Sequence, residues 1–143
     1  MSSDPVTEKV VCYIVRDGRL LVLEHLDVPW QDAGLQVPAG SVKPGETLSQ
    51  AAHREACEET GLASLRVVAR LGESRYDMAP YRSETQHRHF FHLEVDSATP
   101  ERWTSSEDDP DDGSGRHRFV CYWVPISRGH ALAAGQGALL GRL

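Results

Sequence analysis

The first part of the chain alternates between apolar runs and turn residues in a way that predicts paired strands. Every position of residues 10–15 is apolar. This predicts a strand over residues 9–15 that is covered on both faces and lies centrally in an α/β or α+β domain. Asp17 and Gly18 supply a hairpin turn, after which residues 20–26 return as a second strand. Further strands are predicted over residues 65–75, 86–95 and 119–124.

Helical signals follow in the middle of the chain. Thr47 and Gln50 form the pattern of a capping box, in which each side chain meets the backbone N–H of the other. Gly61 is suited to a left-handed C-cap, so a helix is predicted over Leu48–Thr60. A second helix is predicted over residues 127–140, weakened by its glycines. Loops are predicted over residues 27–34, 76–84 and 100–115, the last of which is acidic and expected to be mobile.

Length and composition fit one domain over residues 1–143. The 15 Lys and Arg residues against 21 Asp and Glu give a net charge of −6, which argues against a nucleic acid polymer as partner. Cys12, Cys57 and Cys121 show no metal-type spacing, and buried free thiols at Cys12 and Cys121 suit a reducing cytosol. The sequence shows neither a signal peptide nor a membrane span, which favours a cytoplasmic location and no membrane association.

The predicted helix carries an unusual acidic face. Glu55, Glu58 and Glu59 stand at i, i+3 and i+4, on the same side as the small and apolar residues of the helix. Two carboxylates about 5 Å apart repel by about 3 kcal/mol at an effective dielectric near 20, so this crowding needs a neutralising partner. A hard divalent cation is one solution. The alternative is that Glu55 pairs with Arg54 or Arg66 and the other carboxylates are solvated.

The residues around this face favour the cation. Glu46 adds a carboxylate in the loop that enters the helix, and Arg54 can hold a glutamate by a two-pronged hydrogen bond. The stretch from Gly40 to Leu62 resembles the Nudix box: its fixed glycine and charged positions are all matched, and Ala56 stands where a larger aliphatic residue is usual. The matched positions are Gly40, Glu46, Arg54, Glu55, Glu58, Glu59 and Gly61.

The resemblance implies a Nudix-like α/β/α sandwich with a mixed β-sheet and a Mg²⁺- or Mn²⁺-dependent hydrolase. In this family Glu55, Glu58 and Glu59 would bind the ion together with the Gly40 carbonyl. Glu46 would bind a second ion or orient the other ligands, and Arg54 would hold a glutamate in place. Glu58, Glu55 and Arg54 are therefore the expected catalytic residues. The proton acceptor is either a glutamate of the box or a loop acid, for which the candidates are Glu107, Asp108 and Asp109.

The same resemblance implies a small-molecule nucleotide substrate and cleavage of a diphosphate linkage. The Pro-Ala-Gly sequence before the box favours ADP-ribose or a nucleotide sugar. Trp30 and Tyr81 are the expected base-stacking residues, and the expected phosphate-binding residues are Arg75, Arg82 and Arg88. A histidine metal site at His87 and His89, which would share one face of a strand, is weighed against ordinary surface or core histidines.

Other functions stay open at this point. The alternatives are a nucleoside triphosphate pyrophosphatase, a non-catalytic nucleotide sensor on the same fold, and a domain that a cation merely stabilises. Many members of the family form dimers, so a homodimer is compatible with the sequence, although no residue identifies an interface.

Overall fold

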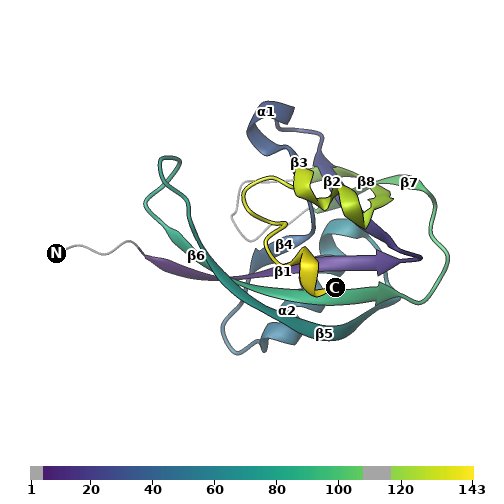
Figure 1. Cartoon of the computed structure of the whole chain (residues 1–143), viewed down its shortest axis with the longest axis horizontal. Helices are drawn as coiled ribbons and strands as arrows, with labels where there is room; N and C mark the ends of the chain where they lie inside the picture. The colour runs from purple at the N-terminus through teal and green to yellow at the C-terminus, as the bar shows by residue number, and fades with distance from the viewer. Residues whose placement is uncertain (1–4, 108–116) are drawn as a thin grey trace.

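A computed structural model describes residues 5–107 and 117–143 of the chain. A long β-sheet forms its frame, with one main helix, α2 (Leu48–Thr60), and a short one, α1 (Trp30–Ala33) (Figure 1). The strands are β1 (Val6–Arg16), β2 (Arg19–His25), β3 (Leu35–Gln36), β4 (Ala39–Ser41), β5 (Leu65–Asp77), β6 (Thr85–Val95), β7 (Arg102–Glu107) and β8 (His117–Pro125). Two short 3₁₀ helices, η1 (Ile126–Ala131) and η2 (Leu140–Arg142), end the chain.

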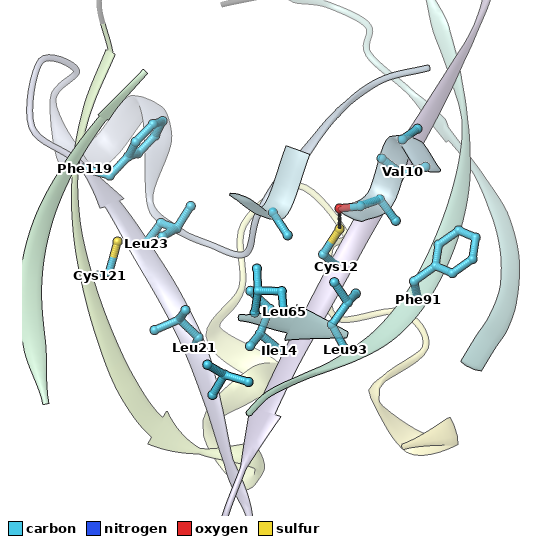
Figure 2. Packing of buried hydrophobic residues seen from close by; sticks show 14 of the residues in the cluster. Val10, Cys12, Ile14, Leu21, Leu23, Leu65, Phe91, Leu93, Phe119 and Cys121 are labelled. Atoms are coloured by element: carbon cyan, nitrogen blue, oxygen red, sulfur yellow. Dashed lines mark hydrogen bonds between the residues drawn. The ribbon is translucent and has the colours of Figure 1, made fainter. Parts of the chain in front are cut away.

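The sheet divides into two arms at the β1–β2 hairpin. Its strand order is β5-β6-β1-β2-β8-β7, and β1 pairs with β6 in parallel while the other pairs are antiparallel. β1 and β2 pair only next to their turn. Beyond that point β4 pairs with β1 and β3 pairs with β2, so the two strands diverge, as Figure 2 shows. The expected mixed sheet is therefore confirmed.

Both faces of β1 are buried, as its continuous apolar run predicts. On one face Val10, Cys12 and Ile14 join a core cluster that includes Ala51, Ala52 and Ala56 of α2 (Figure 2). On the other face Val11 and Tyr13 join a second cluster, against which residues of the C-terminal segment pack. Alternate residues of one strand thus face two different layers.

The local signals around α2 are confirmed. The Thr47 hydroxyl accepts from the Gln50 N–H at 3.1 Å, and the Gln50 side chain accepts from the Thr47 N–H at 2.9 Å. Gly61 ends the helix in the left-handed region with φ of 74°. Cys12 and Cys121 are buried free thiols, also as expected.

Two predictions about the second half of the chain are wrong. The segment expected to be a helix over residues 127–140 forms η1 and turns instead, because Ala134 and Gly135 adopt positive φ and Gly129 packs directly against Leu140. Part of the expected acidic loop is strand β7, which pairs with β8 along its whole length. Residues 108–115 of that loop lie outside the described residues. Among the described helices, none has the length and hydropathy needed to cross a membrane.

Candidate metal centre

Helix α2 carries its glutamates on a largely buried side. The Glu55 side chain is only 2% exposed, and Ala51, Ala52 and Ala56 beside it are fully buried. Glu58 and Glu59 are partly buried. The acids therefore share the inner side of the helix, as the sequence predicts, while the Glu58 side chain is 35% exposed and the alternative pairing of Glu55 with Arg54 is present at 2.8 Å.

Gly40 in β4 leaves room for the Glu55 carboxylate. A Cβ atom at this position would lie 2.1 Å from Cδ of Glu55 and 2.3 and 2.4 Å from its two oxygens. No pair of nonbonded atoms tolerates such separations, so any side chain at residue 40 would displace the carboxylate. The glycine that opens the sequence motif is therefore required by the glutamate in the middle of it.

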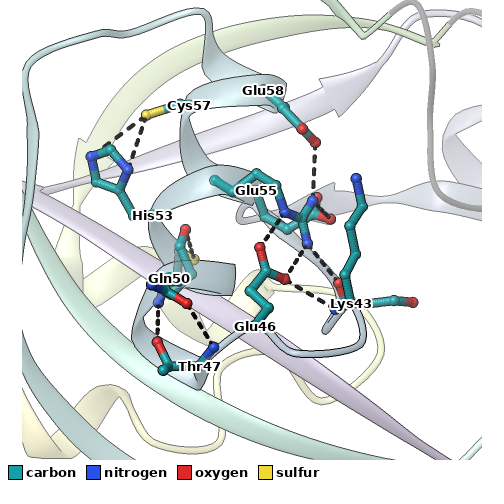
Figure 3. A network of polar contacts seen from close by, with 12 residues as sticks. Lys43, Glu46, Thr47, Gln50, His53, Glu55, Cys57 and Glu58 are labelled. Carbon is teal, nitrogen blue, oxygen red and sulfur yellow. Dashed lines mark hydrogen bonds and ion pairs between the residues drawn. The ribbon is translucent and has the colours of Figure 1, made fainter.

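Arg54 connects three of the glutamates, which are labelled in Figure 3 as Glu46, Glu55 and Glu58. Its Nε and Nη2 donate to the two carboxylate oxygens of Glu46 at 2.7 and 2.9 Å. Its Nη1 donates to Glu55 at 2.8 Å and to Glu58 at 3.3 Å, and its Nη2 also reaches the Ser41 carbonyl at 2.9 Å. The guanidinium thus fixes the carboxylates relative to one another and to the end of β4.

The arrangement gives Glu46 a supporting position. The bidentate contact with Arg54 is the main cause that lowers the pKa of Glu46 to about 2, and the Lys43 N–H adds a hydrogen bond of 3.0 Å. Both carboxylate oxygens of Glu46 therefore have a protein donor. Of the two roles open to Glu46 from sequence, orienting the other ligands through Arg54 fits this geometry better than direct coordination.

Glu59 is part of the same group of carboxylates. Its carboxylate accepts from the Ala39 N–H at 2.9 Å. Burial, followed by the negative charges of Glu55, Glu107 and Glu58, raises the pKa of Glu59 well above its usual range. A cation bound among these carboxylates would favour the charged form of Glu59.

Strand β7 brings a further carboxylate into the site. Glu107 is 8% exposed at the end of β7. Carboxylate oxygens of Glu55, Glu58 and Glu107 all lie within 4.8 Å of one another. From the sequence, Glu107 is expected only as an acid of a mobile loop. The alternation of Trp103, Ser105 and Glu107 at every second position was the signal for a strand that points these side chains inward.

These glutamates open onto a cleft of about 330 Å³. Its acidic lining residues are Glu55, Glu59, Glu84 and Glu107. Its lining also includes Lys9 and Arg82, and Arg82 lies 3.8 Å from the carboxylate of Glu84. Lys9 also donates to the Ser41 hydroxyl at 2.7 Å. Lys9 is a cleft residue that was not identified from the sequence. Its signal is its place next to an apolar residue of β1, because neighbouring residues of a strand point to opposite faces of the sheet.

The donor set fits a hard divalent cation. Several carboxylate oxygens converge at ligand spacing, Gly40 leaves the space for one of them, and Glu59 is buried among like charges. Oxygen donors of this kind suit Mg²⁺ or Mn²⁺. Glu55, Glu58 and Glu107 are the residues that can hold such an ion, with Glu59 and the Gly40 backbone lining the same cleft.

A second cleft of about 180 Å³ adjoins the first, since Lys9, Ala39 and Gly40 line both. Arg88 lines this second cleft, where it lies 4.3 Å from the centre of the Tyr76 ring and donates to Gln86 at 3.0 Å. Its burial lowers the pKa of the Arg88 guanidinium.

The predicted substrate residues thus fall into two groups. Arg82 and Arg88 line the two clefts. Trp30 and Tyr81 are 58% and 88% exposed, and Arg75 is an exposed residue of β5. None of these three is among the described residues that line either cleft.

Comparison with known proteins agrees with this arrangement. A model of the NUDIX domain matches residues 6–139. Nudix hydrolase 25 from Arabidopsis thaliana is 37% identical over 71 residues, which are 49% of this chain and 39% of that protein. The chain therefore matches well under half the length of this curated relative.

Solved structures share the fold. A MutT NUDIX hydrolase from Burkholderia pseudomallei superposes with a TM-score of 0.71 at 24% identity, covering 98% of this chain and 99% of that one. A MutT protein from Methanosarcina mazei Go1 gives a TM-score of 0.70 at 19% identity, covering 99% and 95%. A UDP-X diphosphatase gives 0.66 at 15% identity, covering 99% of this chain and 64% of that one.

Proposed function

The chain belongs to the NUDIX domain family, and from this premise we propose that it is a Mg²⁺-dependent pyrophosphohydrolase that cleaves the diphosphate linkage of a nucleoside diphosphate derivative. The observation that carries the proposal is the convergence of carboxylate oxygens from Glu55, Glu58 and Glu107 within 4.8 Å. This cluster lies beside a cleft whose lining includes Lys9 and Arg82. The cation site and the phosphate-binding groups are therefore adjacent.

The contacts support separate roles for the residues of the site. Glu55, Glu58 and Glu107 would hold the ion, and Glu59 and the Gly40 carbonyl complete the oxygen-rich wall. When bound, the ion cancels charge on the phosphate oxygens and lowers the pKa of the attacking water. Arg54 keeps Glu55 and Glu58 in place. Lys9 and Arg82, which line the cleft, would bind oxygens of the diphosphate.

The adjoining cleft supports a substrate that extends beyond the diphosphate. Its lining includes the guanidinium group of Arg88 and the amide side chains of Gln36, Gln86 and Gln136. Such a mixture of donors and acceptors suits the hydroxyl groups of ribose or of a hexose. We therefore favour ADP-ribose or a nucleotide sugar over a nucleoside triphosphate, which needs room for a third phosphate instead.

An activity panel tests the proposal. The purified chain is incubated with Mg²⁺ and ADP-ribose, nucleotide sugars, dinucleoside polyphosphates or nucleoside triphosphates, and the released nucleotide and phosphate are measured. Glu58→Gln should lower turnover at least about a hundredfold, equivalent to about 2.7 kcal/mol of transition-state stabilisation. Glu94→Gln is the matched control. Glu94 lies on β6, where its partly exposed carboxylate pairs with Arg66.

The outcomes separate the candidate functions. Turnover that is lost in Glu58→Gln and kept in Glu94→Gln supports the hydrolase, and the preferred compound identifies the substrate class. Tight nucleotide binding without turnover supports a sensor and overturns the proposed activity. Stabilisation by Mg²⁺ with neither binding nor turnover of any compound supports a purely structural cation.

A further inference from the structure

Two histidines and two glutamates meet across three neighbouring strands, away from the centre described above. We call Glu8, Glu73, His87 and His89 the His–Glu cluster. Glu8 of β1 is in register with His87 of β6, and Glu73 of β5 is in register with His89. All four therefore lie side by side on one face of the sheet.

The His–Glu cluster is separate from the clefts proposed to bind the substrate. His87 and His89 stand four and two residues before Phe91, a member of the core cluster under α2, so they point to the α2 side of the sheet. Lys9, the neighbour of Glu8, points to the opposite face of β1 and lines both clefts. The His–Glu cluster shares no residue with the lining of those clefts.

The contacts within the cluster are hydrogen bonds whose lengths come close to the spacing of metal ligands. Oε2 of Glu8 lies 2.9 Å from Nδ1 of His87 and 2.9 Å from Nε2 of His89. The two ring centroids are 4.3 Å apart. Around a tetrahedral Zn²⁺ with bonds of about 2.0–2.1 Å, neighbouring ligand atoms are about 3.3 Å apart. One atom from each of Glu8, His87 and His89 therefore already lies close to the positions that a shared ion requires.

The surroundings of the two rings also resemble the support given to metal-binding histidines. Nε2 of His87, the nitrogen that points away from Glu8, lies 3.2 Å from a carboxylate oxygen of Glu73. A carboxylate on the outer nitrogen fixes the orientation and tautomer of a metal-ligating imidazole. His87 and His89 have side chains only 15% and 7% exposed, and their strands hold the backbone in place. Little conformational freedom remains to be lost on binding.

One group opposes metal binding. Nη2 of Arg70 lies 3.2 Å from Nδ1 of His89 and 3.1 Å from a carboxylate oxygen of Glu73. If a metal took Nε2 of His89, Nδ1 would carry the proton and Arg70 would have to turn away. The Arg70 side chain is 45% exposed and keeps Glu73 as a partner, so this movement is local.

We propose that Glu8, His87 and His89 form a second metal site, specific for Zn²⁺ or a similar transition metal ion, with Glu73 orienting His87. Two imidazole nitrogens and one carboxylate select such ions over Mg²⁺, which prefers oxygen donors. The site joins the N-terminal part of β1 to β6. Because Thr7 and Lys9 of the same segment line the catalytic cleft, an ion here would fix the strand that carries them.

The test is a calorimetric titration of the full chain with Zn²⁺ in the presence of millimolar Mg²⁺. One equivalent is expected to bind. His87→Gln and His89→Gln should each weaken Zn²⁺ binding at least about a hundredfold, and Glu73→Gln about tenfold. His130→Gln is the control for loss of an exposed histidine elsewhere. Glu58→Gln is the control for the other centre, and both should bind Zn²⁺ like the unaltered chain.

A second measurement uses the unaltered protein, so that a misfolded variant cannot leave the question open. With ¹⁵N-labelled histidine, Zn²⁺ should shift the ring nitrogen resonances of two of the seven histidines, identified by comparison with His87→Gln. Absence of Zn²⁺ binding would overturn the proposal. So would binding that is unchanged in His87→Gln, or binding that is lost in Cys57→Ser instead, since the Cys57 sulfur lies 3.8 Å from His53.

Discussion

Replacing Gly40 by alanine is a sharp perturbation of the proposed centre because it adds one carbon atom at a known place. The new Cβ would lie 2.1 Å from Cδ of Glu55, so the carboxylate must move by about 1 Å or more to restore a contact of about 3.5 Å. Movement of this size breaks the 2.8 Å hydrogen bond between Glu55 and Arg54. The backbone of Gly40 lies outside the left-handed region, so the alanine adds no strain of that kind.

The expected result has two parts. Loss of a hydrogen bond between charged groups should cost about 1.5–3 kcal/mol of folding stability. Misplacement of a metal ligand by about 1 Å should lower turnover about a hundredfold. Gly141→Ala is the matched control, because Gly141 has an ordinary backbone and no atom within 4 Å of an added Cβ. Thermal unfolding and the Mg²⁺-dependent release of nucleotide measure the two effects.

The reasoning is refuted if Gly40→Ala keeps turnover within about twofold of the unaltered chain and binds Mn²⁺ equally well. That result would mean that the position of Glu55 against β4 is irrelevant to the cation. Equal losses in Gly40→Ala and Gly141→Ala would also refute it, because only the first substitution meets the carboxylate.

Three further predictions concern the same helix. Arg54→Lys keeps the charge but loses the bidentate contact with Glu46, so turnover should fall about 10–100-fold. Full activity in a kinetic assay would show that this bidentate contact is dispensable. Because the pKa of Glu46 is lowered from 4.5 to about 2, its contribution is complete above pH 4.5 and is lost as pH falls toward 2. Glu46→Gln should therefore be less stable than the unaltered chain by up to about 3 kcal/mol at pH 7. Denaturant unfolding measures this difference, which should shrink in acid. Thr47→Ala removes the hydroxyl that accepts from Gln50 and should cost about 1 kcal/mol, whereas an unchanged melting temperature would mean that the capping box contributes nothing.

Much of the fold and the helix that carries the glutamates could be predicted because their signals are local. The apolar run of β1 reports its burial on both faces, and Thr47, Gln50 and Gly61 fix the ends of α2 through contacts within a few residues. The buried position of Glu55 follows from the same periodicity. Gly40 and Arg54 could be singled out through the resemblance to the Nudix box, although only the structure shows that both contact Glu55.

What could not be predicted depends on contacts that are distant in sequence. β7 is polar enough to resemble a loop, and its pairing with β8 overrides that preference. Glu107 reaches Glu55 and Glu58 only through this pairing. The C-terminal segment failed as a helix because Ala134 and Gly135 turn with positive φ. Trp30 and Tyr81 are expected to stack on a base because of their residue type and their loop positions near the box, yet both are exposed and neither is among the described residues that line the two clefts.

The central claim is that carboxylates from α2 and β7 together hold one divalent cation. Direct titration with Mn²⁺ tests this claim without any assumed substrate. The electron paramagnetic resonance signal of the free ion measures how much Mn²⁺ is bound. Glu58→Gln and Glu107→Gln should each weaken Mn²⁺ binding at least about tenfold, while Glu94→Gln should bind as the unaltered chain does. Mn²⁺ binding that is the same in all four proteins would contradict the account.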